Sequence, residues 1–282
     1  MTSDRLGLQL VSTVAAAVVV AATSASAQGD NGFLRGAGKT DVALTYTSES
    51  YDHFWVGNQR VKDPGVGEIT RESLSLYVAH GLTDDMDVVM AAAYVDAEND
   101  GFGAFDDERQ LQDLSLGVKW RAGGSDLLGG RLSYLLAPSV KVPMTHYESN
   151  NPTAIGDGQV DVRARGILHY QSPNGFFAAV ETGFDYRAEG PPNETLVNVS
   201  LGQTFFNRVT VSPFLTITNS IHGKNIGQDD FPAVEEDIER LGVSLYGRVN
   251  DQVGVTLGWK NTLDGRNTGD LTGWWLGVVF KI

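Results

Sequence analysis

The sequence ends in the stretch Trp274-Trp275-Leu276-Gly277-Val278-Val279-Phe280-Lys281-Ile282. Every second residue from Trp274 to Ile282 is apolar, whereas the alternate positions include Gly277 and Lys281. Successive side chains of a β-strand point to opposite faces, so this alternation predicts a terminal strand with one fully apolar face.

The opposite end of the sequence has the order of features found in a secretory signal. Arg5 precedes an apolar run over residues 15–22, and Ala25-Ser26-Ala27 supplies small residues at a cleavage site. We therefore expect residues 1–27 to be a signal peptide that is removed after Ala27. Residues 28–38 are then a short periplasmic segment, and residues 39–282 a transmembrane β-barrel in a bacterial outer membrane.

The composition restricts the class of protein. The sequence contains no cysteine, which fits an exported protein and excludes thiolate metal sites. The net charge of −14 argues against nucleic acid as a partner. No apolar run after residue 27 approaches the ~20 residues of a spanning helix, and only helices and closed barrels satisfy every backbone group in lipid. Any spanning structure must therefore be a barrel.

The mature sequence divides into twelve segments, and in each of them the residues at every second position are predominantly apolar. The segment with Leu114, Leu116, Val118 and Trp120 on one parity is an example. Aromatic residues gather at the segment ends, as in the interfacial girdles of membrane barrels. These patterns predict an all-β fold, a twelve-stranded antiparallel transmembrane barrel. Pro138 lies inside a segment, as does Pro213, and each removes a ladder hydrogen bond, so we expect bulges or bends there.

The connections between the segments alternate in length. Residues 52–68, 97–110, 144–159 and 221–237 form long connections, whereas residues 81–85, 171–175, 206–208 and 250–252 form short ones; residues 122–130 form a medium one. Long external loops and short periplasmic turns give this asymmetry. Most acidic residues fall in the connections on the long-loop side, among them Asp157 and Glu236 in long connections and Glu194 in the medium connection over residues 188–194. We therefore expect an acidic outer rim and both termini in the periplasm.

The inward parity carries many basic side chains, with fewer acidic ones opposing them. Two interpretations stay open: a salt-bridged interior that fills itself, or a ladder of Arg and Lys that attracts anionic solutes. Inward aromatic residues would supply apolar contacts to a solute. The candidate residues of the solute path are Lys119, Lys141, Arg163, Arg165, Arg187, Arg240, Arg248, Lys260, Tyr77, Phe177, Phe214, Tyr246 and Trp275.

The sequence carries no pattern of an enzyme. It lacks a Gly-x-Ser-x-Gly elbow, a Gly-rich phosphate loop and a His-Glu-x-x-His site. The His222-Gly223 pair lacks the Ser-Asn neighbours of outer-membrane phospholipases. We expect no catalytic residue, no cofactor and no resident metal ion. The acidic runs Asp106-Asp107-Glu108 and Asp229-Asp230 are either solvated loops or sites for divalent cations shared with lipopolysaccharide phosphates.

Three stretches resemble a family of outer-membrane transporters associated with meta-pathway phenol degradation. They are His80-Gly81-Leu82-Thr83-Asp84-Asp85-Met86-Asp87-Val88, Asp113-Leu114-Ser115-Leu116-Gly117-Val118-Lys119-Trp120-Arg121 and Leu136-Ala137-Pro138-Ser139-Val140-Lys141-Val142-Pro143. The resemblance implies passage of small organic solutes, aromatic or anionic ones among them, across the outer membrane. The expected partners are the lipid bilayer, lipopolysaccharide, a small-molecule solute, and the barrel assembly machinery through the terminal strand. The alternative is a plugged barrel that stabilises the envelope or binds a partner without transport.

Overall fold

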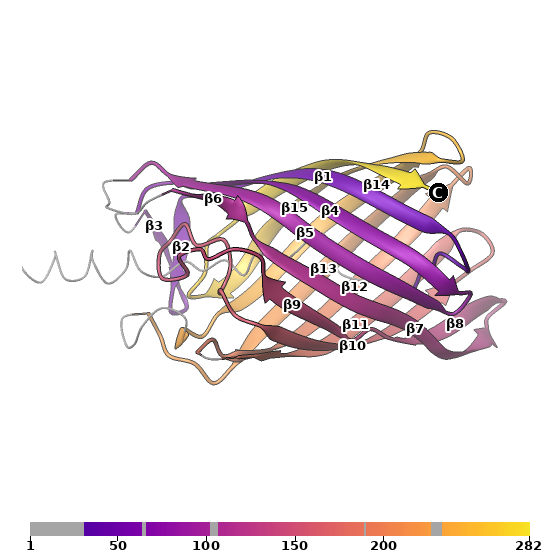
Figure 1. The fold of residues 1–282 in the computed structure, drawn as a ribbon, viewed down its shortest axis with the longest axis horizontal. Helices are drawn as coiled ribbons and strands as arrows, with labels where there is room; N and C mark the ends of the chain where they lie inside the picture. Colours follow the sequence, from indigo (N-terminus) through magenta and orange to yellow (C-terminus); the bar gives the residue numbers. More distant parts are fainter. Residues whose placement is uncertain (1–30, 64–65, 102–106, 189, 227–232) are drawn as a thin grey trace, which may run out of the picture.

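A computed structural model describes residues 31–63, 66–101, 107–188, 190–226 and 233–282. The predicted signal peptide lies outside the described residues. The strands wind around one barrel (Figure 1). They are β1 (Thr40–Tyr51), β2 (His53–Val56), β3 (Gln59–Lys62), β4 (Ile69–Thr83), β5 (Met86–Asn99), β6 (Glu108–Leu111), β7 (Asp113–Leu127), β8 (Gly130–Leu136), β9 (Ser139–Pro143), β10 (Asp161–Gln171), β11 (Phe176–Arg187), β12 (Asn193–Phe205), β13 (Val209–Ile221), β14 (Asp237–Arg248), β15 (Val253–Arg266) and β16 (Thr272–Lys281).

The sheet closes on itself, and this confirms the predicted twelve-stranded antiparallel barrel. The terminal strand β16 pairs with β1, with Leu44 opposite Val278. On the other side of β1, the pairing runs through β4 and β5 to β7. Two of the wall strands are interrupted. β6 and β7 together form one of them, because both pair with β5. β8 and β9 together form the other, because both pair with β10. Strands β2 and β3 form a separate hairpin.

The two prolines are accommodated in different ways. Pro138 lies between β8 and β9, where the wall strand breaks. β13 continues through Pro213 without a register shift, and the ladder to β12 lacks the pairs opposite Ser212 and Pro213. The Ser212 hydroxyl donates to the Leu201 carbonyl at 2.9 Å, which replaces the amide donor that proline lacks. The wall strand is thus interrupted at Pro138, and no bulge is present at Pro213.

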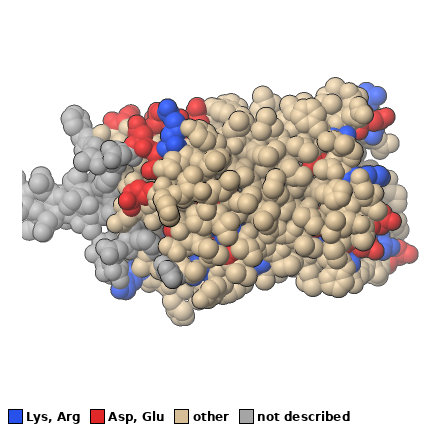
Figure 2. All heavy atoms as spheres, viewed as in Figure 1, with Lys and Arg blue, Asp and Glu red and all other residues tan. Residues whose placement is uncertain are grey.

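Alternating side chains face the surroundings and the lumen, as the sequence pattern predicts. Outward residues such as Leu116 and Leu276 are 48% and 53% exposed. Inward residues such as Ala93 and Ser133 are buried. Charged residues gather at the two ends of the barrel in Figure 2, and the band between them is almost free of charge. An apolar outer band between two charged ends is the surface of a membrane barrel. Among the described residues, no helix is long and apolar enough to cross a membrane.

The connections differ at the two ends of the barrel. The end with the C-terminal residue of β16 has tight turns, and the opposite end has the long connections and the β2–β3 hairpin (Figure 1). The predicted medium connection over residues 122–130 is wrong: β7 and β8 extend into it, and only Leu128 and Gly129 form the turn. Both residues have positive φ, 50° and 77°, which matches the twist of a two-residue hairpin.

The long-connection end has its own apolar cluster. This cluster consists of Tyr51, Phe54, Val66, Ile69 and Leu271, which bury one another although they come from three separate parts of the chain. The hairpin is held against the connection between β15 and β16, since the Trp55 amide donates to the Thr268 carbonyl at 2.7 Å. Buried apolar contacts thus hold the hairpin, residues 66–69 and the connection between β15 and β16 together at this end of the barrel.

Candidate functional site

The barrel encloses a cavity of about 210 Å³. Its wall carries seven basic and six acidic side chains. Nine of the predicted solute-path residues line it: Lys119, Lys141, Arg163, Arg165, Arg187, Arg240, Lys260, Tyr77 and Phe214. The cavity thus brings together residues from most of the wall strands, with an almost balanced charge.

The four other predicted path residues lie away from the cavity wall. Arg248 is exposed at the short-turn end, 3.9 Å from Asp251. Tyr246 lies near that end, with the Lys281 ammonium 5.3 Å from its ring centroid. Phe177 stacks on His169, and Trp275 packs against Phe214 at 6.3 Å between ring centroids. All thirteen residues remain candidates for a role in transport.

The connection between β9 and β10 folds into the lumen. Its residues 151–157 are all buried, and Ile155 packs on Ala93, Val95 and Ala97 of β5. The Arg71 guanidinium of β4 donates to the Ala154 carbonyl at 2.7 Å and attaches the loop to the wall at β4. An inward loop of this kind narrows the passage inside the barrel.

Asp157 holds the inner end of this loop. Its carboxylate accepts hydrogen bonds from Lys141 Nζ at 2.9 Å and from Arg187 Nη2 at 2.6 Å. Burial by itself raises the pKa of Asp157, but the two cations outweigh burial and hold the pKa below its ordinary value. Asp157 is therefore ionised at neutral pH, and it neutralises part of the basic wall.

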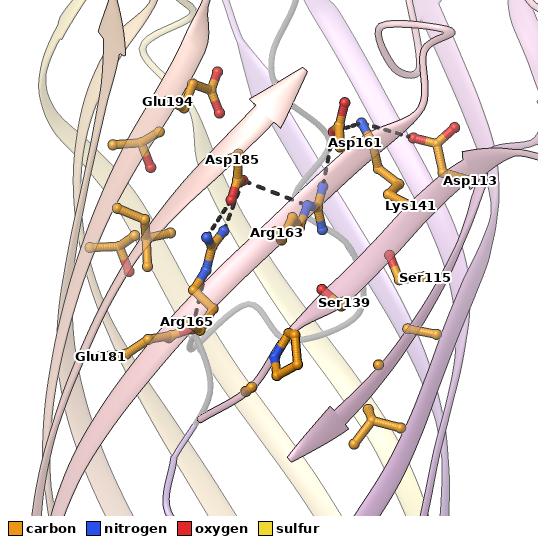
Figure 3. A pocket seen from close by; sticks show the side chains of 18 of the residues that line it. Asp113, Ser115, Ser139, Lys141, Asp161, Arg163, Arg165, Glu181, Asp185 and Glu194 are labelled. Atoms are coloured by element: carbon orange, nitrogen blue, oxygen red, sulfur yellow. Dashed lines mark hydrogen bonds and ion pairs between the residues drawn. The ribbon is translucent and has the colours of Figure 1, made fainter. Parts of the chain in front are cut away.

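The remaining charges on this side form a continuous network (Figure 3). Arg165 donates two hydrogen bonds to Asp185 and lies 3.5 Å from Glu181. Arg163 lies between Asp161 at 3.5 Å and Asp185 at 3.6 Å. The first interpretation of the sequence, a salt-bridged interior, thus describes this part of the wall.

The charged side chains of β14 and β15 are less fully paired than those of β10 and β11. Lys260 on β15 forms an ion pair with Glu49 on β1. Arg240 on β14 is buried, and two of its guanidinium nitrogens, Nε and Nη2, have no hydrogen-bond partner among the residues that the structure describes. Arg240 is therefore a basic group with uncommitted donors on the β14 side of the lumen.

The N-terminal segment enters the lumen from the short-turn end. Phe33 contacts the rings of His169 and Phe177 edge-on, at centroid distances of 4.6 and 5.1 Å. The Arg35 backbone amide donates to the carboxylate of Asp87 at 3.0 Å. The division of the sequence that assigns residues 28–38 to the periplasm stays a prediction. The described part, residues 31–38, contacts inward side chains of the wall.

Three acidic residues that the sequence analysis assigned to the outer rim are buried instead. Asp157 and Glu194 line the cavity, and Glu236 is 6% exposed and accepts a hydrogen bond from the Thr268 hydroxyl at 2.6 Å. Burial raises the pKa of Glu236 to about 7, although this hydrogen bond lowers it. The apolar pair Ala154-Ile155 inside a polar connection was the available signal that this loop folds inward.

The described residues contain no group of three His, Cys, Asp or Glu side chains placed to hold a metal ion. Of the acidic runs considered for divalent cations, Asp106, Asp229 and Asp230 lie outside the described residues. No metal or cofactor enters the function proposed below.

Comparison with solved structures supports the fold. The chain is similar to a COG4313 outer membrane channel from Pseudomonas putida F1, with a TM-score of 0.75 and 12% identity over 92% of this chain and all of that one. It also resembles the translocator domain of the autotransporter NalP from Neisseria meningitidis, with a TM-score of 0.52 and 11% identity over 87% and 88% of the two chains. The NanC porin gives a TM-score of 0.52 and 9% identity over 84% of this chain and all of that chain.

A search of curated proteins finds no match to this sequence. A family model described as "Putative MetA-pathway of phenol degradation" matches residues 26–277. That match covers nearly the whole barrel, which agrees with the resemblance noted in three short stretches of the sequence. The chain is an outer-membrane β-barrel and belongs to this family.

Proposed function

We propose that this protein is an outer-membrane channel that takes up small organic solutes, anionic and aromatic ones among them. The carrying observation is the charged cavity of about 210 Å³ inside the barrel. A cavity of this size and polarity holds on the order of ten water molecules, or a small solute in their place. The similar outer-membrane channel and porin have the same fold, and this supports a transport function rather than an enzymatic one.

The charges on the cavity wall support a modest preference for anions. Basic groups exceed acidic ones by one, and most are paired, so the local potential is small. Charges at a constriction set the selectivity of a pore, whereas exposed loop charges are screened beyond ~8 Å at physiological ionic strength. Selectivity should therefore depend on the lumen and not on the acidic loops.

The second candidate function is a plugged barrel with a structural role. One observation favours it: residues 151–157 of the loop between β9 and β10 and the segment at residues 31–38 occupy the lumen from its two ends. In this case the inward charges serve only to fill the barrel. Lipopolysaccharide, the bilayer and the assembly machinery would be its partners, as they would be for a channel.

A liposome-swelling series separates the two functions. Purified full-length protein is reconstituted, and swelling is followed in glycerol, benzyl alcohol, acetate and benzoate. A channel gives rates above those of protein-free liposomes, with the smallest solutes fastest. Heat-unfolded protein serves as the control. Rates equal to the protein-free background for every solute, with folded protein in the liposomes, would reject transport and leave the structural barrel.

A further inference from the structure

The unpaired side of the lumen has a specific geometry. Arg240 points inward from β14, is 5% exposed and lines the cavity. Its Nε and Nη2 atoms are buried without a hydrogen-bond partner among the described residues. These two nitrogens form one edge of the guanidinium, the edge that binds a carboxylate through two parallel hydrogen bonds.

No described acidic group accepts a hydrogen bond from this edge. The two acidic residues that act on Arg240 electrostatically are Glu49 and Glu236. Glu49 is paired with Lys260, and Glu236 accepts from Thr268. Burial raises the pKa of Glu236 to about 7, so it carries only part of a charge at neutral pH. Arg240 is always protonated. Because Glu49 and Glu236 are engaged elsewhere, neither carboxylate is committed to Arg240 as a counter-ion.

The same row of the wall has a further free donor. Thr216 on β13 lies opposite Arg240, and Asn198 on β12 lies opposite Thr216. The Thr216 hydroxyl donates to Asn198 Oδ1 at 2.8 Å, and the Asn198 Nδ2 group is buried without a partner in the described part of the chain. A buried donor without a partner costs free energy unless water or a ligand satisfies it. This row thus contains two buried groups, the Arg240 guanidinium and the Asn198 amide, with donors that no described acceptor satisfies.

A buried aromatic ring lies on the strand next to that of the guanidinium. Phe214, which lines the cavity, is opposite Gly242, two residues along β14 from Arg240 on the same face. A Cβ atom on Gly242 would lie 2.3 Å from the Phe214 ring, so this ring lies over the glycine backbone. Trp275 lies likewise against Gly258 and contacts Phe214. Positions two apart on a strand are about 7 Å from each other, roughly the length of a small aromatic acid.

We propose that Arg240 and Phe214 form a binding site for a small carboxylate that carries a flat apolar group. The carboxylate accepts two hydrogen bonds from Nε and Nη2 of Arg240, and the flat group lies on Phe214. The proposal rests on the proposed function, since it places one solute class on the path through the lumen. Acetate has only the charge and benzyl alcohol only the ring, so both should bind more weakly than benzoate.

Calorimetric titration of the folded full-length protein in detergent tests the site without any need for transport. Benzoate should bind at least about tenfold more tightly than acetate or benzyl alcohol. Arg240→Met should weaken benzoate binding at least about tenfold, whereas Arg208→Met, which removes an exposed arginine from a short turn, should leave it unchanged. Phe214→Leu should weaken benzoate binding and leave acetate binding as it is.

Two outcomes would overturn the site: equal affinity of the wild type for benzoate and benzyl alcohol, or full benzoate affinity in folded Arg240→Met. If that variant does not fold, Arg240→Lys keeps the charge but lacks the two-pronged edge, and unchanged affinity there would also reject the proposal. Conductance of the same preparations separates the two claims. Benzoate binding without conductance supports the site and rejects the channel, whereas conductance without Arg240-dependent binding rejects the site.

Discussion

Phe33 should control how firmly the N-terminal segment closes the short-turn end of the lumen. Its ring makes edge-on contacts with His169 and Phe177, at centroid distances of 4.6 and 5.1 Å. Each such aromatic pair contributes about 0.5–1.5 kcal/mol beyond its buried area, so Phe33→Ala removes about 1–3 kcal/mol from the docked state. The ratio of released to docked segment should therefore rise by about 5- to 150-fold.

Single-channel recording in planar bilayers measures this ratio as the fraction of time in the higher-conductance state. Phe33→Ala should increase that fraction, because the remaining hydrogen bonds, among them those from the Arg35 amide to Asp87 and from the Gly32 amide to His169, hold the segment less firmly without the ring contacts. Phe206→Ala is the matched control, since Phe206 lies in a turn at the same end and is 93% exposed. Identical conductance and occupancy in the wild type, Phe33→Ala and Phe206→Ala would refute the view that this segment obstructs the passage.

Three further predictions concern the wall, the loops and the orientation. Leu116→Arg on the outward face should lower the free energy of unfolding in lipid by about 2–4 kcal/mol, and Ser115→Arg on the inward face by less; equal losses would contradict the assignment of faces. Glu236 binds its proton more tightly in the folded protein, so its contribution to stability falls as pH rises from about 4.5 to about 7. Glu236→Gln should therefore raise the melting temperature at pH 8 but not at pH 4. Cysteine at Glu148 should react with an impermeant thiol reagent on intact cells, whereas cysteine at Asn250 should not; equal labelling would reject the orientation.

Much of the barrel could be predicted from the sequence because its signals are local. The alternation from Trp274 to Ile282 decides which side chains of β16 face outward, since the period of a strand is two residues. The same rule decides the outward face of every other wall strand. Turn chemistry is equally local, although the Leu128-Gly129 turn was missed because the apolar pattern weakens over residues 122–127.

Several features of the lumen depend on contacts between residues far apart in the sequence. Asp157 belongs to a polar connection by its neighbours, yet it becomes an interior residue because Lys141 and Arg187 converge on it. Whether an inward arginine is paired depends on the strand register: Arg163 lies opposite Asp185 across β10 and β11, whereas Arg240 lies opposite Thr216. Sequence alternation names the inward residues but cannot state their partners.

The sequence by itself thus determined the strand faces, the number of wall strands and the set of inward side chains. Only the tertiary structure decided which loop enters the lumen, that residues 31–38 occupy its short-turn end, and which cations remain without an acceptor. The physical reason is that the face to which a side chain points depends only on its position in the alternation of its own strand. The state of a buried charge depends instead on Coulomb and hydrogen-bond partners that the closure of the barrel brings within a few ångströms.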